Sequence, residues 1–185
     1  MLTEIAKQQL RKAGWYEGRK IDLTKYEEEY AKLGLKLFPA ARKFLEEFGN
    51  LDIQDKYLST STDKNGNRIL IINRSVTGIP YCCFKPSQEI IDKVGKNILP
   101  VGLIDHGNIY IYISTDGKIY TNWYNIGLWA ENADQLWNEY YGEDEGWATW
   151  DDLKAGKGRT MRKKELKNIC KHILIKNYFY EKLGV

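Results

Sequence analysis

Carboxylates are concentrated in residues 119–153, and they are the side chains of this chain best suited to catalysis or to binding a charged partner. The segment has eight of them and no lysine or arginine: Glu131, Asp134, Glu139, Glu143, Asp144, Glu145, Asp151 and Asp152. Two carboxylates held roughly 5–10 Å apart can serve as the catalytic pair of a glycoside hydrolase. These lie on an expected helix and in an expected loop without a catalytic motif, so the pattern favours binding.

Aromatic side chains are interleaved with these carboxylates. The same segment holds five of the six tryptophans: Trp123, Trp129, Trp137, Trp147 and Trp150. A surface of carboxylates and aromatic rings suits a basic protein partner, because charge speeds the encounter and buried aromatics carry much of the affinity. The alternative interpretation is a tryptophan-rich core beneath a solvated acidic face. The lack of interspersed basic residues favours the binding surface.

Charge is divided between two neighbouring blocks of opposite sign. Residues 119–153 are formally −8, and residues 154–185, with ten Lys/Arg against two Glu, are formally +8. The net charge of +3 is therefore that of the first 118 residues. The basic tail could dock on its own domain, neutralise the acidic block or bind nucleic acid. Its aromatic residues at 178–180 follow the basic cluster instead of lying within it, which disfavours nucleic acid.

Other potentially catalytic or metal-binding side chains lack the required context. His106 lies in an expected turn between strands, and His172 is far from it in sequence, so no metal spacing is present. Cys82 and Cys83 follow Pro80 in a hydrophobic stretch, where buried, unreactive thiols are expected. The chain has no Gly-x-Ser-x-Gly motif and no glycine-rich phosphate loop. We therefore predict no catalytic residue, no metal and no cofactor.

Composition and cysteine usage indicate a protein of a reducing compartment. Three cysteines, two of them adjacent, do not form a disulfide framework. No apolar run approaches the roughly 20 residues of a membrane span, and residues 1–19 lack the apolar core of a signal peptide. We expect a cytoplasmic protein that does not contact a membrane.

Hydrophobic periodicity and turn residues predict an α+β domain. Helices are expected at residues 2–13, at 40–48, at 87–94, at 133–141 and from a cap at Asp22 or Thr24 to Leu33. Strands are expected at residues 51–58, 68–73, 99–104, 108–114 and 118–122, with hairpin turns at Asn65-Gly66 and Asp116-Gly117. Ile109, Ile111 and Ile113 alternate with Tyr110 and Tyr112, so the sheet should have an aliphatic and an aromatic face.

These elements imply a mixed, largely antiparallel sheet flanked by helices. We assign residues 1–150 to this domain. Residues 151–185 form a basic extension with an expected amphipathic helix at 161–183, whose apolar stripe includes Leu166, Ile169 and Ile173.

Three segments carry a family resemblance. They are residues 10–19 (LRKAGWYEGR), residues 38–51 (FPAARKFLEEFGNL) and residues 99–102 (LPVG). Together they resemble the third subgroup of the SUKH superfamily of bacterial immunity proteins, over roughly residues 1–145. One departure is Asn50, which stands where the family usually has a second glycine. Asparagine tolerates left-handed backbone conformations, so the turn can survive.

The resemblance implies a SUKH-like fold and a function for the chain. Members of the family bind the toxin domain encoded beside them, commonly a nuclease or a nucleic-acid deaminase of a polymorphic or contact-dependent system. The motif residues that would specify the fold are Gly14, Trp15, Arg19, Phe48, Gly49, Pro100 and Gly102. Trp15 should fill the gap between the first helix and the sheet, and Arg19 should bond to backbone carbonyls or to a buried acid. The three glycines should serve backbone conformation.

A second set of residues is predicted to face the partner, on the basis of charge and aromaticity and not of the motif. The set is Glu131, Asp134, Glu139, Tyr141, Glu143, Asp144, Glu145 and Trp147. We predict that it occludes the basic active-site cleft of a cognate toxin, with no direct contact to nucleic acid. The alternatives are an intracellular scaffold or adaptor, a carbohydrate-binding module, or an enzyme.

Overall fold

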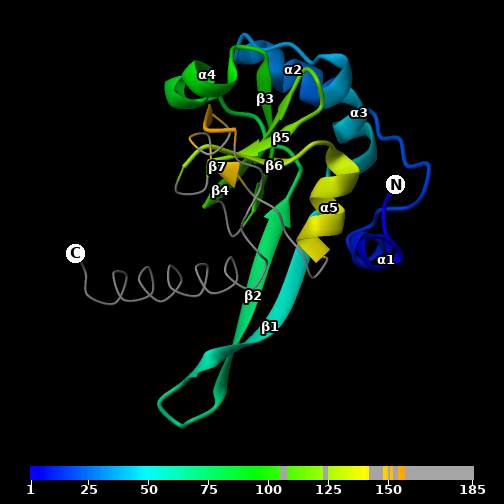
Figure 1. Cartoon of the computed structure of the whole chain (residues 1–185). Helices are drawn as coiled ribbons and strands as arrows, with labels where there is room; N and C mark the ends of the chain where they lie inside the picture. The colour runs from blue at the N-terminus through cyan, green and yellow to red at the C-terminus, as the bar shows by residue number, and fades with distance from the viewer. Residues whose placement is uncertain (105–107, 123–124, 142–147, 150, 152–153, 157–185) are drawn as a thin grey trace.

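The computed structural model describes residues 1–104, 108–122, 125–141, 148–149, 151 and 154–156 (Figure 1). The expected helix at residues 161–183 lies outside these residues, as does most of the basic extension. Within the described part, helices and one sheet form an α+β fold, as predicted.

The helices lie where the hydrophobic pattern predicts them. They are α1 (Glu4–Lys12), α2 (Thr24–Lys32), α3 (Pro39–Phe48), α4 (Gln88–Val94) and α5 (Ala133–Tyr141). At the start of α1, the Thr3 hydroxyl accepts a 3.3 Å hydrogen bond from the Ala6 N–H. Before α2, the Asp22 carboxylate accepts a 3.2 Å hydrogen bond from the Thr24 N–H. The N-cap residue is nevertheless Leu23, which has no side-chain cap bond, so the predicted cap at Asp22 or Thr24 is wrong. Pro39 occupies the first turn of α3, where its missing N–H is not needed.

One antiparallel sheet runs through the domain in chain order. Its strands are β1 (Asp52–Thr62), β2 (Arg68–Val76), β3 (Ile98–Ile104), β4 (Ile109–Ser114), β5 (Ile119–Thr121), β6 (Gly127–Ala130) and β7 (Ala148–Thr149). Every pairing among the described strands is antiparallel. Short turns therefore suffice between most neighbours, as at the predicted turn between β4 and β5, where Gly117 has a φ of 85°.

The strands β1 and β2 form a two-stranded arm that extends away from the rest of the sheet (Figure 1). Pairing of β2 with β3 is recorded at Val76 opposite Leu103, at the base of the arm. Near the tip, Ile69 and Leu70 are 42% and 56% exposed. These described residues near the tip therefore lie outside the core, whereas Ile53 near the base of the arm belongs to it.

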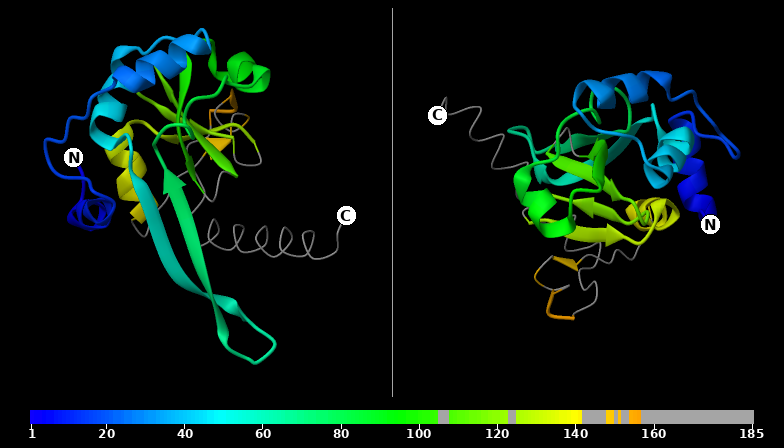
Figure 2. Two further views of the ribbon diagram at one scale, coloured as in Figure 1. Left: turned by 180° about the vertical axis from the view of Figure 1, so that it is seen from behind. Right: turned by 90° about the horizontal axis from the view of Figure 1, so that it is seen from above.

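The central part of the sheet, around β4, is buried on both faces. The isoleucines of β4, among them Ile111, belong to the larger hydrophobic cluster with Trp137 and with side chains from α1, α2, α3 and α5. Tyr110 and Tyr112 belong to a smaller cluster with Ile90 of α4. The predicted aliphatic and aromatic faces are therefore confirmed. Figure 2 shows α1, α3 and α5 grouped together, away from α4.

The turn from α3 into β1 is held by two side chains from earlier in the chain. Arg19 donates 2.7 Å hydrogen bonds to the carbonyl oxygens of Glu47 and Gly49, which confirms the first of its two predicted roles. Asn50 has a φ of 56°, so it adopts the left-handed conformation expected of it. The Tyr26 hydroxyl accepts a 2.9 Å bond from the Asn50 N–H and lies 2.8 Å from the Asn50 side-chain oxygen.

The motif glycines have two different physical roles. Gly14 has a φ of 94° after α1, as expected for a residue that serves backbone conformation. Gly49 has an ordinary φ of −62°, and Gly102 is not among the residues with positive φ. These two glycines provide space instead. A Cβ on Gly49 would lie 2.4 Å from the Leu45 carbonyl oxygen, and one on Gly102 would lie 2.8 Å from the Val76 carbonyl oxygen.

Candidate partner-binding cleft

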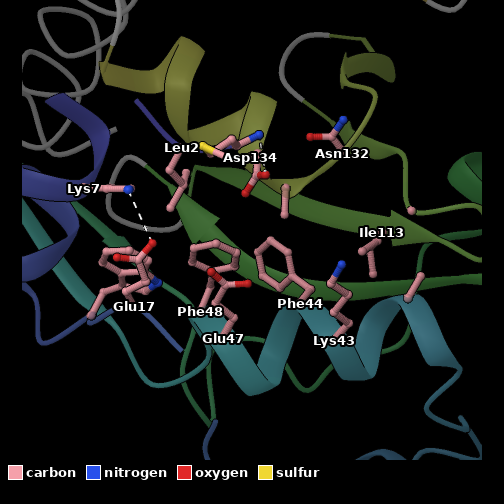
Figure 3. A pocket seen from close by; sticks show the side chains of 15 residues that line it. Leu2, Lys7, Glu17, Lys43, Phe44, Glu47, Phe48, Ile113, Asn132 and Asp134 are labelled. Carbon is pink, nitrogen blue, oxygen red and sulfur yellow. Dashed lines mark hydrogen bonds and ion pairs between the residues drawn. The ribbon is translucent and has the colours of Figure 1, made fainter. Parts of the chain in front are cut away.

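A cleft of about 460 Å³ opens between α1, α3 and the start of α5 (Figure 3). Its floor is apolar and is formed by Leu2, Trp15, Phe44, Phe48 and Ile113, each at most 8% exposed. Its rim carries polar and charged groups: Lys7, Glu17, Lys43, Glu47, Asn132 and Asp134. An apolar concavity with a few convergent polar groups is the usual form of a binding site for a small group or side chain.

Helix α3 supplies the aromatic part of the floor. Phe44 and Phe48 are four residues apart and therefore share one helix face, with ring centroids 5.4 Å apart. Phe48 also packs against Trp137 of α5, at 5.7 Å between centroids. Trp15 is 3% exposed and belongs to the same core cluster, which confirms its predicted packing role, and the Arg11 guanidinium lies 5.9 Å from its ring centroid. Trp15 thus both packs the domain and lines the cleft.

Several charges at the rim are already paired. Lys7 lies 3.3 Å from Glu4 and 3.5 Å from Glu17, and its hydrogen bond with Glu4 contributes most to raising its pKa above the ordinary value. The Asp134 carboxylate lies 2.8 Å from the amino group of Met1. Figure 3 shows the contact between Lys7 and Glu17 across one end of the cleft.

Glu47 differs from these groups because it is half-buried and forms no ion pair with any residue that the structure describes. Burial, and then the negative charge of Asp134, raises the pKa of its carboxyl group above the ordinary value. The indole N–H of Trp15 and the ammonium of Lys43 oppose this rise. Glu47 is therefore a partly desolvated carboxylate at the edge of the aromatic floor, and Trp15 and Lys43 offset only part of the cost of its burial.

The structure describes four of the eight residues predicted to face a partner. Glu131 lies 4.0 Å from Lys118 and its side chain is 50% exposed. Asp134 is 40% exposed and is the member of the set that lines the cleft. Glu139 accepts a 2.8 Å hydrogen bond from Gln135, and Tyr141 is half-buried. The other four, Glu143, Asp144, Glu145 and Trp147, lie outside the described residues.

Two of the tryptophans in the acidic segment belong to the core. Trp137 is 0% exposed and Trp129 is 9% exposed. Tyr141 stacks on Trp137, with centroids 6.5 Å apart and an angle of 21° between the rings. For these two tryptophans the core interpretation is therefore correct, whereas Trp123, Trp147 and Trp150 lie outside the described residues.

Sequence reasoning missed the charged residues of α3 as part of a site. Neither Lys43 nor Glu47 was predicted to belong to a site, because charged residues of an amphipathic helix are expected on its solvent face. Glu47 instead borders the apolar stripe, because it precedes Phe48 and follows Phe44 by three positions. That spacing is the sequence signal that could have identified it. The motif residue Pro100 has a structural role, since its carbonyl oxygen accepts a 2.5 Å bond from the Tyr30 hydroxyl.

Of the two adjacent cysteines, Cys82 is buried and Cys83 is half-buried. The hydrogen bond with Cys83, together with burial, raises the pKa of the fully buried Cys82 thiol, so that thiol is protonated at neutral pH. His106 lies outside the described residues. Among the residues described, no group of three or more His, Cys, Asp or Glu side chains is arranged to hold a metal ion. No helix in the same residues is both long and apolar enough to cross a membrane.

Comparison with protein families gives one clear result. Residues 2–141 match the family model described as SUKH-3 immunity protein. No curated protein and no solved structure matches the chain significantly. The matched region extends from α1 to the end of α5 and includes every residue that lines the cleft except Met1. It also contains the three segments whose resemblance was recognised in the sequence. The chain belongs to the SUKH-3 immunity protein family.

Proposed function

We propose that this chain neutralises a cognate bacterial toxin by occupying the toxin's basic active-site cleft, without catalysing a reaction. The toxin is a nuclease or a nucleic-acid deaminase of a polymorphic or contact-dependent system, and the complex forms in the cytoplasm. The observation that carries the proposal is the family match over residues 2–141, which supports an immunity role with a toxin as partner.

Electrostatics supports the choice of a toxin that acts on nucleic acid. An active site that holds phosphates is basic. Carboxylates can take the place of the phosphates, and aromatic rings can take the place of the bases. Glu131 and Asp134, with side chains 50% and 40% exposed, lie at the start of the acidic segment that has no lysine or arginine. We therefore place the toxin-facing surface in residues 131–147.

The expected binding constants follow from this role. A single free toxin molecule can kill the cell, so the complex should be nanomolar or tighter, on the order of −12 kcal/mol. Because a charged surface steers the encounter, the association rate should fall as the salt concentration rises.

The test begins with the toxin encoded beside this gene or captured with the full chain from its native host. We expect stoichiometric inhibition of that toxin. The triple variant E143K/D144K/E145K should associate at least about tenfold more slowly at low salt, with a weaker salt dependence. The variant E27K/E28K/E29K on α2 changes the net charge equally and should associate as the wild type does. Equal slowing in both variants would contradict the surface assignment, and no inhibition by the wild type would contradict the function.

A further inference from the structure

One buried polar group in the cleft has no hydrogen-bond partner in the described part of the chain. It is the indole Nε1 of Trp15, a residue that is 3% exposed and lines the cleft. The N–H approaches the Glu47 carboxylate, where it opposes the rise in that group's pKa, but the pair does not have the geometry of a hydrogen bond. A buried donor without an acceptor lowers stability relative to a satisfied one. An occupant of the cleft that carries an acceptor would remove this penalty.

The charged side chains that line the cleft indicate which second group, besides a hydrogen-bond acceptor, an occupant should carry. Lys7 is engaged by Glu4 and Glu17, and Asp134 is engaged by the amino group of Met1. Glu47 is left as a half-buried carboxylate that makes no ion pair with a described residue. A cation beside it would compensate its desolvation and offset the repulsion from Asp134.

We infer that the cleft receives an arginine side chain of the toxin, with the guanidinium on Glu47 and an adjacent backbone carbonyl of the toxin accepting from the Trp15 N–H. The floor favours arginine over lysine, because a planar guanidinium can lie against the rings of Phe44 and Phe48 while its edge donates to a carboxylate. An anionic group is disfavoured, because it would face both Glu47 and Asp134, and the ammonium of Lys43 at the rim would offset only part of that repulsion. This inference rests on the proposed function for the identity of the partner.

The contact would lie beside Asp134, which lines the cleft and also belongs to the acidic segment. The acidic segment would then speed the encounter, and the cleft would hold one side chain of the toxin in a desolvated site. Desolvated, well-packed sites of this kind hold the side chains that dominate the affinity of protein interfaces.

The experiment uses the full chain and a probe that does not depend on knowing the toxin. The peptide acetyl-Gly-Arg-Gly-amide is titrated into ¹⁵N-labelled protein, and the Trp15 indole N–H resonance, assigned with Trp15→Phe, is followed. We expect a saturable shift with a dissociation constant of about 1–10 mM, as suits one side chain with a backbone carbonyl. The matched peptide with uncharged citrulline, and the matched peptide with lysine, should bind more weakly.

Two variants on α3 test whether the guanidinium of the peptide binds Glu47. Glu47→Gln should weaken the arginine peptide at least fivefold, whereas Glu46→Gln, one residue earlier on the same helix and outside the cleft lining, should leave binding unchanged. Both variants should keep the thermal transition of a folded protein. The inference is overturned if the indole resonance does not move up to about 20 mM peptide. It is also overturned if the citrulline peptide binds equally, or if the two variants behave alike.

Neutralisation of the toxin separates this inference from the proposed function. If wild-type protein and Glu47→Gln bind the toxin equally, the cleft does not hold a toxin arginine, while the immunity function stands. If the wild type binds no toxin, the proposed function fails and the assignment of the arginine to a toxin fails with it. Binding of the peptide would still identify the cleft as an arginine site.

Discussion

The Arg19 guanidinium donates a 2.7 Å hydrogen bond to the carbonyl oxygen of Gly49, thirty residues further along the chain. A second 2.7 Å bond goes to the carbonyl oxygen of Glu47. Both acceptors lie at the C-terminal end of α3, where carbonyls lack helical partners and a cation is favoured by the helix dipole. Arg19 thus fixes the end of the helix that carries the cleft's aromatic floor, and the motif residue acts on the candidate site through the backbone.

Replacing Arg19 with lysine should lower the free energy of unfolding by about 2 kcal/mol, because one ammonium cannot reproduce both bonds of the planar guanidinium. Urea denaturation measures the change. Lys20→Gln, at the exposed neighbouring position, should change the stability by less than about 0.5 kcal/mol. Equal stability of R19K and the wild type would show that the two bonds contribute nothing net.

Replacing Gly49 with alanine should lower stability more than the same replacement at a glycine that has open space around it. Its Cβ would lie 2.4 Å from the Leu45 carbonyl oxygen and 2.9 Å from Ile21 Cδ1, so backbone must shift, and we expect a loss of about 3 kcal/mol. Gly34→Ala is the comparison, because its φ is 72° and no atom lies within 4 Å of the added Cβ. That variant should lose only about 1 kcal/mol from backbone strain. Thermal melting of the two variants ranks them, and the reverse order would contradict the steric argument.

Asn50 should be replaceable by glycine but not by alanine. Its φ of 56° is strained for residues with a Cβ, and asparagine tolerates it better than alanine does. Asn50→Gly relieves the strain but loses the side-chain contact with Tyr26, so its stability should be within about 0.5 kcal/mol of the wild type. Asn50→Ala loses the contact and keeps the strain, and should be less stable by about 1–2 kcal/mol. Chemical denaturation of the three proteins tests the order, and an alanine variant as stable as glycine would contradict it.

Most elements of the fold could be predicted because their signals are local, whereas the short strands β6 and β7 were not expected from the sequence. The apolar spacing of α3 and the alternation of isoleucine and tyrosine in β4 need no knowledge of distant contacts. Asn50 likewise reveals its backbone conformation through its residue type and its place after a helix. For the hydrogen-bond partners of Arg19 the sequence left two alternatives, backbone carbonyls or a buried acid. A guanidinium can donate to either kind of oxygen, so the residue type alone does not decide between them.

The site was harder to predict because it depends on packing between α1, α3 and α5. Charge density pointed to the acidic segment, yet Trp129 and Trp137 of that segment are buried in the core. Glu47 looks like an ordinary solvent-facing residue in the sequence. Its spacing from Phe44 and Phe48 places it at the edge of the apolar stripe, but the approach of Asp134 across the cleft depends on how α5 packs.

Glu47 should make stability depend on pH in a direction opposite to that of a salt-bridged acid. Its folded-state pKa is raised by burial and then by Asp134, so the folded protein holds this proton more tightly than the unfolded chain does. Stability is therefore lost as the pH rises from the ordinary glutamate pKa, about 4.3, through the raised value. Glu47→Gln removes the ionisation and should melt at a higher temperature than the wild type at pH 7. The difference should vanish as the pH falls to about 4.

Asp52 should give stability a pH dependence opposite to that from Glu47. Its hydrogen bonds with Arg74 lower its folded-state pKa, so this carboxylate stabilises the fold above its unfolded pKa, and that contribution is lost on acidification. Asp52→Asn should therefore melt below the wild type at pH 7 and converge with it in acid. If Glu47→Gln, like Asp52→Asn, melts below the wild type at pH 7, the ionised Glu47 carboxylate does not destabilise the free protein. A rise in melting temperature combined with weaker toxin binding would show that the fold retains an unfavourable charge that its partner compensates.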